Sequence, residues 1–110
     1  MFDFLNKKAK DAVPPILPEG TARRRYTIEG RVQGVGFRYR AQYAAQYLEL
    51  TGWVRNEDDG SVTLEVQGKP EQFVQMFAMI QKSDFIQITS MREKQLPPDP
   101  WERSFSVRGY

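Results

Sequence analysis

The apolar residues of this chain change their spacing several times, and this alternation limits the folds that it can adopt. Every second residue is apolar or small over 25–32 and again over 61–68, which is typical of strands with one buried face. Apolar residues instead recur at helical spacing over 37–50 and 70–80. A helix with a single apolar stripe must bury that stripe against another element, so the pattern predicts helices packed on a sheet.

Shorter segments complete the expected order of elements. Residues 51–56 predict a second strand, and the turn at 57–60 joins it to the strand that follows. A fourth strand is expected over about 85–95, and a short last strand within 104–110. The order is β-α-β-β-α-β with an extra C-terminal strand. This order predicts an α+β, ferredoxin-like sandwich in which two helices pack on one face of a mostly antiparallel sheet.

The composition removes several classes of enzyme chemistry. The chain has 110 residues, enough for one domain, and contains neither cysteine nor histidine. Thiol or imidazole nucleophilic catalysis, Cys/His zinc sites and haem held by these residues are therefore excluded. Catalysis has to rely on arginine, lysine, carboxylates, amides, hydroxyls or backbone N–H groups. No apolar run approaches the roughly 18 residues of a membrane span, and no secretory signal is recognisable, so we expect a cytoplasmic protein.

We expect residues 1–22 to form an N-terminal extension of a domain that spans 23–110. The segment 13–20 contains three prolines and a glycine, which disfavours regular structure. We expect residues 1–22 to be flexible. Apolar residues such as Phe2 and Leu5 leave open the alternative of a peptide that docks on a partner.

Positive charge is concentrated near the start of the domain. Six arginines face a single acid, Glu29, in this region: Arg23, Arg24, Arg25, Arg31, Arg38 and Arg40. The net charge of +2 is too small to predict a nucleic-acid-binding protein. The cluster can attract an anion. For residues 23–25 the simpler interpretation is the solvated face of a strand.

A glycine loop joins the first expected strand to the first helix. It consists of Gln33, Gly34, Val35, Gly36 and Phe37. Its glycines permit positive φ, and successive N–H groups beside a helix N-terminus form a cradle for an anion. Arg38 follows in the first helical turn, where the helix dipole disfavours a cation, so an anion is expected to offset it. A phosphoryl group suits the guanidinium fork best. The alternative is a tight turn without a ligand.

Polar residues at the end of the second expected strand are further candidates. The side-chain amide of Asn56 can accept from and donate to one water molecule, although asparagine is also common in turns. The acidic residues Glu57, Asp58 and Asp59 raise the alternative of a magnesium site. Consecutive residues do not converge on one point, so turn formation explains these three better, and we expect no metal.

These segments together resemble the acylphosphatase family. The resemblance rests on GRVQGVGFR, on GWVRN with its asparagine eighteen residues after Arg38, and on DGSV. It covers about 24–69 strongly and the terminal FSVRGY weakly. It implies a ferredoxin-like sandwich that hydrolyses acyl phosphates to a carboxylate and phosphate without a metal or other cofactor. By the same resemblance, Arg38 binds the phosphate, Asn56 orients the attacking water and the loop 33–37 forms the cradle.

The resemblance also implies the partners of the chain. We expect a small-molecule acyl phosphate as substrate, inorganic phosphate as product and inhibitor, no nucleic acid, no membrane and a monomer. Residues 82–91 replace the Gly-Pro and Ala-x-Val strand that the family often has there, so the register of the fourth strand stays open.

Two other functions remain alternatives. One is a non-catalytic, phosphate-binding regulatory domain, and the other is a basic, ferredoxin-like nucleic-acid-binding module. The presence of both Arg38 and Asn56 favours the enzyme, because binding alone does not require a residue that holds water.

Overall fold

The computed structural model describes residues 13–109. Its elements are β1 (Ala22–Arg31), α2 (Phe37–Tyr47), β2 (Thr51–Asn56), β3 (Val62–Gly68), α3 (Pro70–Ile80), β4 (Gln87–Leu96) and β5 (Phe105–Arg108). This confirms the predicted order. The apolar residues Phe2 and Leu5, considered for docking, lie outside the described residues. Within 13–109, no helix has the length and hydropathy needed to cross a bilayer.

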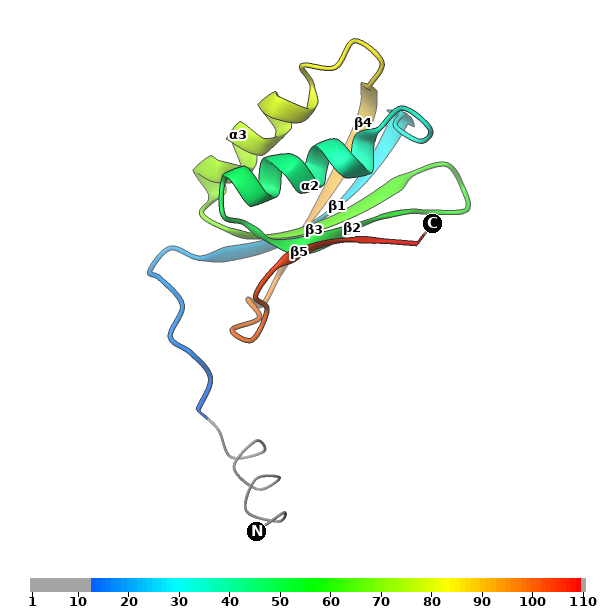
Figure 1. Ribbon diagram of the computed structural model, residues 1–110. Helices are drawn as coiled ribbons and strands as arrows, with labels where there is room; N and C mark the ends of the chain where they lie inside the picture. Colours follow the sequence, from blue (N-terminus) through cyan, green and yellow to red (C-terminus); the bar gives the residue numbers. More distant parts are fainter. Residues whose placement is uncertain (1–12, 110) are drawn as a thin grey trace.

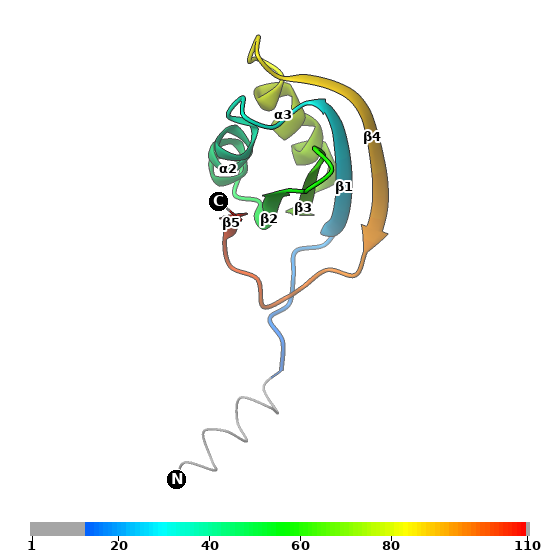
Figure 2. The ribbon, with the colours of Figure 1, turned by 90° about the vertical axis from the view of Figure 1, so that its right-hand side faces the viewer.

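The strands form a five-stranded sheet with the order β4-β1-β3-β2-β5. The pairs β1–β3, β1–β4 and β2–β3 are antiparallel, and β5 lies parallel to β2 at the other edge. Both helices lie on the same face of the sheet (Figure 1). Viewed at right angles, the sheet curves around them, with β4 at its outer edge (Figure 2). The predicted ferredoxin-like sandwich with an added strand is therefore confirmed.

The core lies between the helices and the sheet, as the spacing of apolar residues predicts. The fully buried side chains include Ile28, Val54, Val62, Leu64 and Val66 from strands, Phe37, Ala41, Ala44 and Ala45 from α2, and Phe73, Met76 and Ile80 from α3. Three of the four residues from α2 are alanines, and such small side chains permit a helix to approach a sheet closely. This packing holds α2 against the sheet.

The end of α2 differs from the expectation. The apolar stripe predicts a helix to Leu50, but the helix ends at Tyr47. Glu49 adopts a left-handed conformation with φ of 59°, and the N–H of Leu50 bonds to the carbonyl of Ala45 at 2.8 Å. Leu50 is nevertheless buried, because the turn folds it back onto the core. Apolar spacing identifies a buried face but not the residue at which the backbone leaves the helix.

The register of β4, which the sequence left open, is determined by its pairing with β1. Arg23 lies opposite Leu96 and Arg31 opposite Gln87, with an irregularity between Glu29 and Gly30. Gly30 has a φ of 131°, and a β-carbon there would collide with the carbonyl oxygen of Gln87. Glycine is therefore required where the two strands approach each other.

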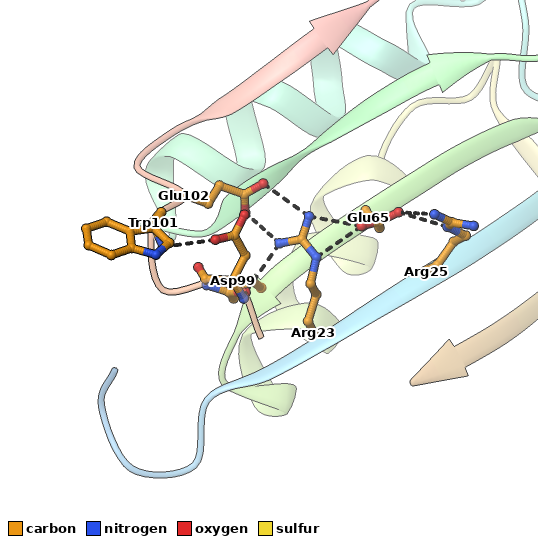
Figure 3. Close-up of polar contacts among 7 residues, drawn as sticks. Arg23, Arg25, Glu65, Asp99, Trp101 and Glu102 are labelled. Atoms are coloured by element: carbon orange, nitrogen blue, oxygen red, sulfur yellow. Dashed lines mark hydrogen bonds and ion pairs between the residues drawn. The ribbon is translucent and has the colours of Figure 1, made fainter. Parts of the chain in front are cut away.

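Arg23 corrects the expectation of a solvated strand face at 23–25. Its side chain is buried and lies between the carboxylates of Glu65 and Glu102, at 2.9 and 2.7 Å (Figure 3). Burial lowers the pKa of Arg23, but the hydrogen bonds and charges of Glu102 and Glu65 more than offset this and leave the pKa raised. Arg25 pairs with the other oxygen of Glu65 at 2.6 Å. The sequence does not indicate this network, because its acidic residues lie more than 35 residues away from the arginines along the chain.

The network holds the connector between β4 and β5 against the sheet face opposite the helices. Glu102 of this connector pairs with Arg23. In addition, the backbone N–H of Asp99 donates to Oε1 of Gln67 at 2.7 Å, and Nε2 of Gln67 donates to the carbonyl of Asp99 at 2.9 Å. This attachment brings the chain across the sheet to the free edge of β2, where β5 pairs.

Replacing Glu65 with glutamine is expected to destabilise the domain by about 1.5–3 kcal/mol, because Glu65→Gln leaves a buried guanidinium without one of its charged partners. Urea unfolding measures this change. Glu93→Gln is the matched control, since Glu93 pairs with Arg24 at 3.8 Å and is half exposed, and it should cost less than about 1 kcal/mol. Equal effects of the two substitutions would contradict the importance of the buried network.

Candidate active site

The loop between β1 and α2 presents backbone N–H groups at a helix N-terminus. Gly34 and Gly36 have φ of 72° and 82°, and neither has an atom within 4 Å of an added β-carbon. The glycines therefore serve the left-handed backbone rather than close packing. Gly36 caps α2 without a side-chain hydrogen bond, and the first turn of the helix contains no acid. The positive end of the helix is thus open to an anion from outside the chain.

A pocket of about 180 Å³ lies at this helix end. Its lining residues are Val32, Gly34, Gly36, Phe37, Arg38, Tyr39 and Asn56. The pocket therefore brings together Arg38 and Asn56, the two side chains singled out in the sequence. Of the predicted loop, Gln33 and Val35 do not line it.

Arg38 reaches the pocket from the first turn of α2. Its Nη1 donates a hydrogen bond of 3.3 Å to the carbonyl oxygen of Arg108 in β5. Among residues 13–109, no carboxylate pairs with this guanidinium. A neutral carbonyl orients the side chain without pairing its charge, and with no carboxylate of that range beside it, Arg38 is suited to binding an anion.

Asn56 is the last residue of β2, and its side chain faces the pocket. Its Oδ1 atom is buried and has no hydrogen-bond partner within residues 13–109. Buried polar atoms nearly always have a partner, because an unpaired one costs about 1–3 kcal/mol. This oxygen can therefore accept a hydrogen bond from a small O–H donor inside the pocket.

Gln33 connects the loop to the β2–β3 hairpin. Its Nε2 donates to the carbonyl oxygens of Glu57 and Ser61 at 2.7 and 2.9 Å. The sequence predicts Gln33 only as part of the anion cradle. Because its side-chain N–H groups already donate to the hairpin, only its backbone N–H is available to an anion. The sequence has no signal for this contact because every residue offers a carbonyl. Gln33 joins the loop before Arg38 to the turn that directly follows Asn56.

The acidic residues of the hairpin form a turn. Glu57 accepts hydrogen bonds from the Thr63 hydroxyl at 2.6 Å and from the guanidinium of Arg55 at 3.0 Å, and these two contacts lower its pKa. The hydroxyl and the backbone N–H of Ser61 similarly lower the pKa of Asp59. Both carboxylates are thereby weaker bases than usual. In the described part of the chain, no group of three acidic side chains is arranged to hold a metal ion.

Three contributors to the site were not identified from the sequence. Val32 and Tyr39 line the pocket, and the carbonyl of Arg108 holds Arg38. Tyr39 carries a weak signal, since it directly follows Arg38. Arg108 has none, because its contact depends on the parallel pairing of β5 with β2.

Comparison with known proteins gives consistent results. The family model described as Acylphosphatase matches residues 24–107. An acylphosphatase of Clostridium perfringens is 42% identical over 77% of this chain and 97% of its own length. One of Bacillus pumilus is 41% identical over 74% of this chain and 92% of its own. The crystal structure of acylphosphatase from Bacillus subtilis superposes with a TM-score of 0.72 at 31% identity, covering 80% of this chain and 99% of that one.

Replacing Gln33 with leucine is expected to lower the free energy of unfolding by about 1–3 kcal/mol, because two hydrogen bonds to the hairpin are lost. Urea unfolding again provides the measurement. Gln46→Leu is the control, since Gln46 is exposed on α2, and it should change stability by less than about 0.5 kcal/mol. A stability change for Gln33→Leu no larger than that of the control would show that the loop and the hairpin are held together by other contacts.

Proposed function

We propose how this chain, which belongs to the acylphosphatase family and is an enzyme that hydrolyses acyl phosphates, carries out its reaction. In this proposal the loop 33–37, Arg38 and Asn56 act without a metal ion. The observation that carries the proposal is the buried, unpaired Oδ1 of Asn56 in the same pocket as Arg38, whose charge no carboxylate of residues 13–109 compensates. One side chain suits an anion and the other suits a water molecule.

The phosphoryl group binds at the helix N-terminus. Backbone N–H groups of the loop donate to its oxygens, and the guanidinium of Arg38 donates from the first turn of α2. The carbonyl of Arg108 limits the rotation of Arg38, so less conformational entropy is lost when the phosphate binds. These contacts hold the phosphorus atom and stabilise its negative charge in the substrate and in the transition state.

Asn56 holds the attacking water. Its Oδ1 accepts one hydrogen from the water, which directs an oxygen lone pair at phosphorus. Gln33 fixes the hairpin that follows Asn56 relative to the loop that binds the phosphoryl group. The distance between the water and the phosphorus therefore depends on a direct contact between the two segments.

The reaction balances without a covalent intermediate. The water oxygen forms a bond to phosphorus, and the bond from phosphorus to the acyl oxygen breaks. Its electron pair leaves with the carboxylate, which is a good leaving group because the substrate is a mixed anhydride. The proton of the water passes to a phosphoryl oxygen. The carboxylates of Glu57 and Asp59, whose pKa values are lowered, are poor alternatives as general bases.

Phosphate release from benzoyl phosphate in the presence of EDTA tests the function. We expect full activity with the chelator, and competitive inhibition by inorganic phosphate, which occupies the cradle. Activity that disappears with EDTA and returns with Mg²⁺ would overturn the proposed metal-independent mechanism.

Substitutions at Arg38 and Asn56 should separate binding from turnover. Arg38→Ala is expected to raise KM and to lower kcat by roughly 10³-fold, because the guanidinium contacts phosphoryl oxygens in both the ground and the transition state. Asn56→Ala should lower kcat by about 10²-fold and leave KM and the inhibition constant of phosphate almost unchanged, because it contacts only the water. Steady-state kinetics of both variants provide the measurement.

Further variants control this experiment. Arg40→Ala removes a neighbouring arginine that bonds to the carbonyl of Met79 instead, and it should keep normal kinetics. Arg38→Lys keeps the charge but not the fork, so it should recover only part of the activity. Loss of phosphate binding in a correctly folded Asn56→Ala would contradict the proposed division of roles.

We further propose that residues 23–110 form the catalytic unit and that residues 1–16 are dispensable for it. Val13 and Ile16 are 84% and 97% exposed, whereas Leu17 and Pro18 line a hollow on the domain. Deletion of residues 1–16 should therefore leave kcat unchanged and shift Tm by less than about 4 °C. Thermal unfolding and phosphate release measure both. A larger fall in either would show that the deleted segment contacts the domain.

A further inference from the structure

The proposed reaction uses Arg38 and Asn56 but leaves one large side chain of the pocket wall, Tyr39, without a role. Tyr39 lines the pocket, and 67% of its surface is exposed. Val32 and Phe37, the other large apolar residues of the wall, are each 1% exposed and belong to the core. Tyr39 is therefore the lining residue with apolar surface available to a ligand.

The geometry of phosphoryl transfer separates the two partners of phosphorus. The attacking and leaving oxygens lie roughly in line on opposite sides of it. Asn56 reaches the pocket from β2, whereas Tyr39 reaches it from the first turn of α2, next to Arg38. With the water on Asn56, the acyl group leaves on the side of phosphorus away from this residue. A side chain from another element of the wall, such as Tyr39, can border that side.

We propose that the ring of Tyr39 contacts the acyl group and gives the enzyme a preference for acyl phosphates with a flat, aromatic acyl group over acetyl phosphate. This inference rests on the proposed function, because it assumes that the phosphoryl group occupies the loop and Arg38. An aromatic ring stacks on an aromatic acyl group, and a methyl group offers little surface for such contact.

Two other tyrosines of α2 provide an internal comparison. Tyr43 and Tyr47 are 66% and 70% exposed, close to the value for Tyr39. Both line a different hollow, of about 410 Å³, together with Arg40, Met79 and Lys82. Exposure alone therefore does not distinguish Tyr39, whereas its position in the wall of the phosphate pocket does. Tyr43→Ala is the matched control, because it removes an equally exposed ring from the same helix.

The ratio of kcat/KM for benzoyl phosphate to that for acetyl phosphate tests the proposal. In Tyr39→Ala this ratio should fall by roughly threefold to tenfold, through a loss confined to benzoyl phosphate. Tyr39→Phe and Tyr43→Ala should keep the ratio of the unmodified enzyme. An unchanged ratio in Tyr39→Ala, or an equal fall in Tyr43→Ala, would overturn the proposal. A fall in Tyr39→Phe as large as that in Tyr39→Ala would assign the effect to the hydroxyl and would also overturn it.

Binding of stable analogues separates this inference from the proposed mechanism. In phenacylphosphonate and acetonylphosphonate a methylene group replaces the bridging oxygen, so neither is hydrolysed. Calorimetry should give a ratio of Kd values, aromatic to methyl, that rises threefold to tenfold in Tyr39→Ala and stays constant in Tyr43→Ala. These binding measurements involve no turnover, so they report on the contact of Tyr39 with the acyl group separately from catalysis by Asn56. Equal ratios in all variants would reject the role of Tyr39 while leaving that of Arg38 intact.

Discussion

The two helices bury the inner face of the sheet, and this burial determines which residues of each strand point inward. The central strand β3 places Val62, Leu64 and Val66 on that face and polar residues on the other. A slip of one residue would exchange the two sets and drive Glu65 into the apolar core. On the opposite face, Glu65 is bound by Arg23 and Arg25. The register of β3 is therefore specified from both sides, and the ends of the neighbouring strands follow from it.

The candidate site lies where three of these constrained elements end or begin. β1 leads into the glycine loop, α2 begins at Phe37, and β2 ends at Asn56. Alanines hold α2 near the sheet, and the side chain of Gln33 joins the loop to the hairpin. Because packing determines each of these positions, the groups that we propose to act on the acyl phosphate are held in place before substrate arrives. Such preorganisation is the main source of catalysis when a reaction needs positioning and charge stabilisation.

The chemistry of an acyl phosphate fits what this chain contains. The substrate is an activated anhydride with a good leaving group, so it requires neither a nucleophilic side chain nor a strong general base. The mechanism that we propose therefore needs only a guanidinium, backbone N–H groups and one amide, in a chain without histidine or cysteine. In this mechanism the phosphoryl end is recognised by charge and hydrogen bonds. The proposed role of Tyr39 assigns discrimination between acyl groups to the apolar part of the pocket wall.

The sequence alone determined the order of the elements, the residues of the buried face and the family. These features depend on the spacing of neighbouring residues: period two in 61–68, helical spacing in 37–50, and a glycine loop before Arg38. Three features became visible only in the folded chain: Arg23 is buried, Gln33 binds the hairpin, and the carbonyl of Arg108 holds Arg38. Each of these contacts joins residues far apart in the chain, often through a backbone carbonyl. Local patterns do not encode such partners, because strand pairing and packing select them only after the sheet has formed.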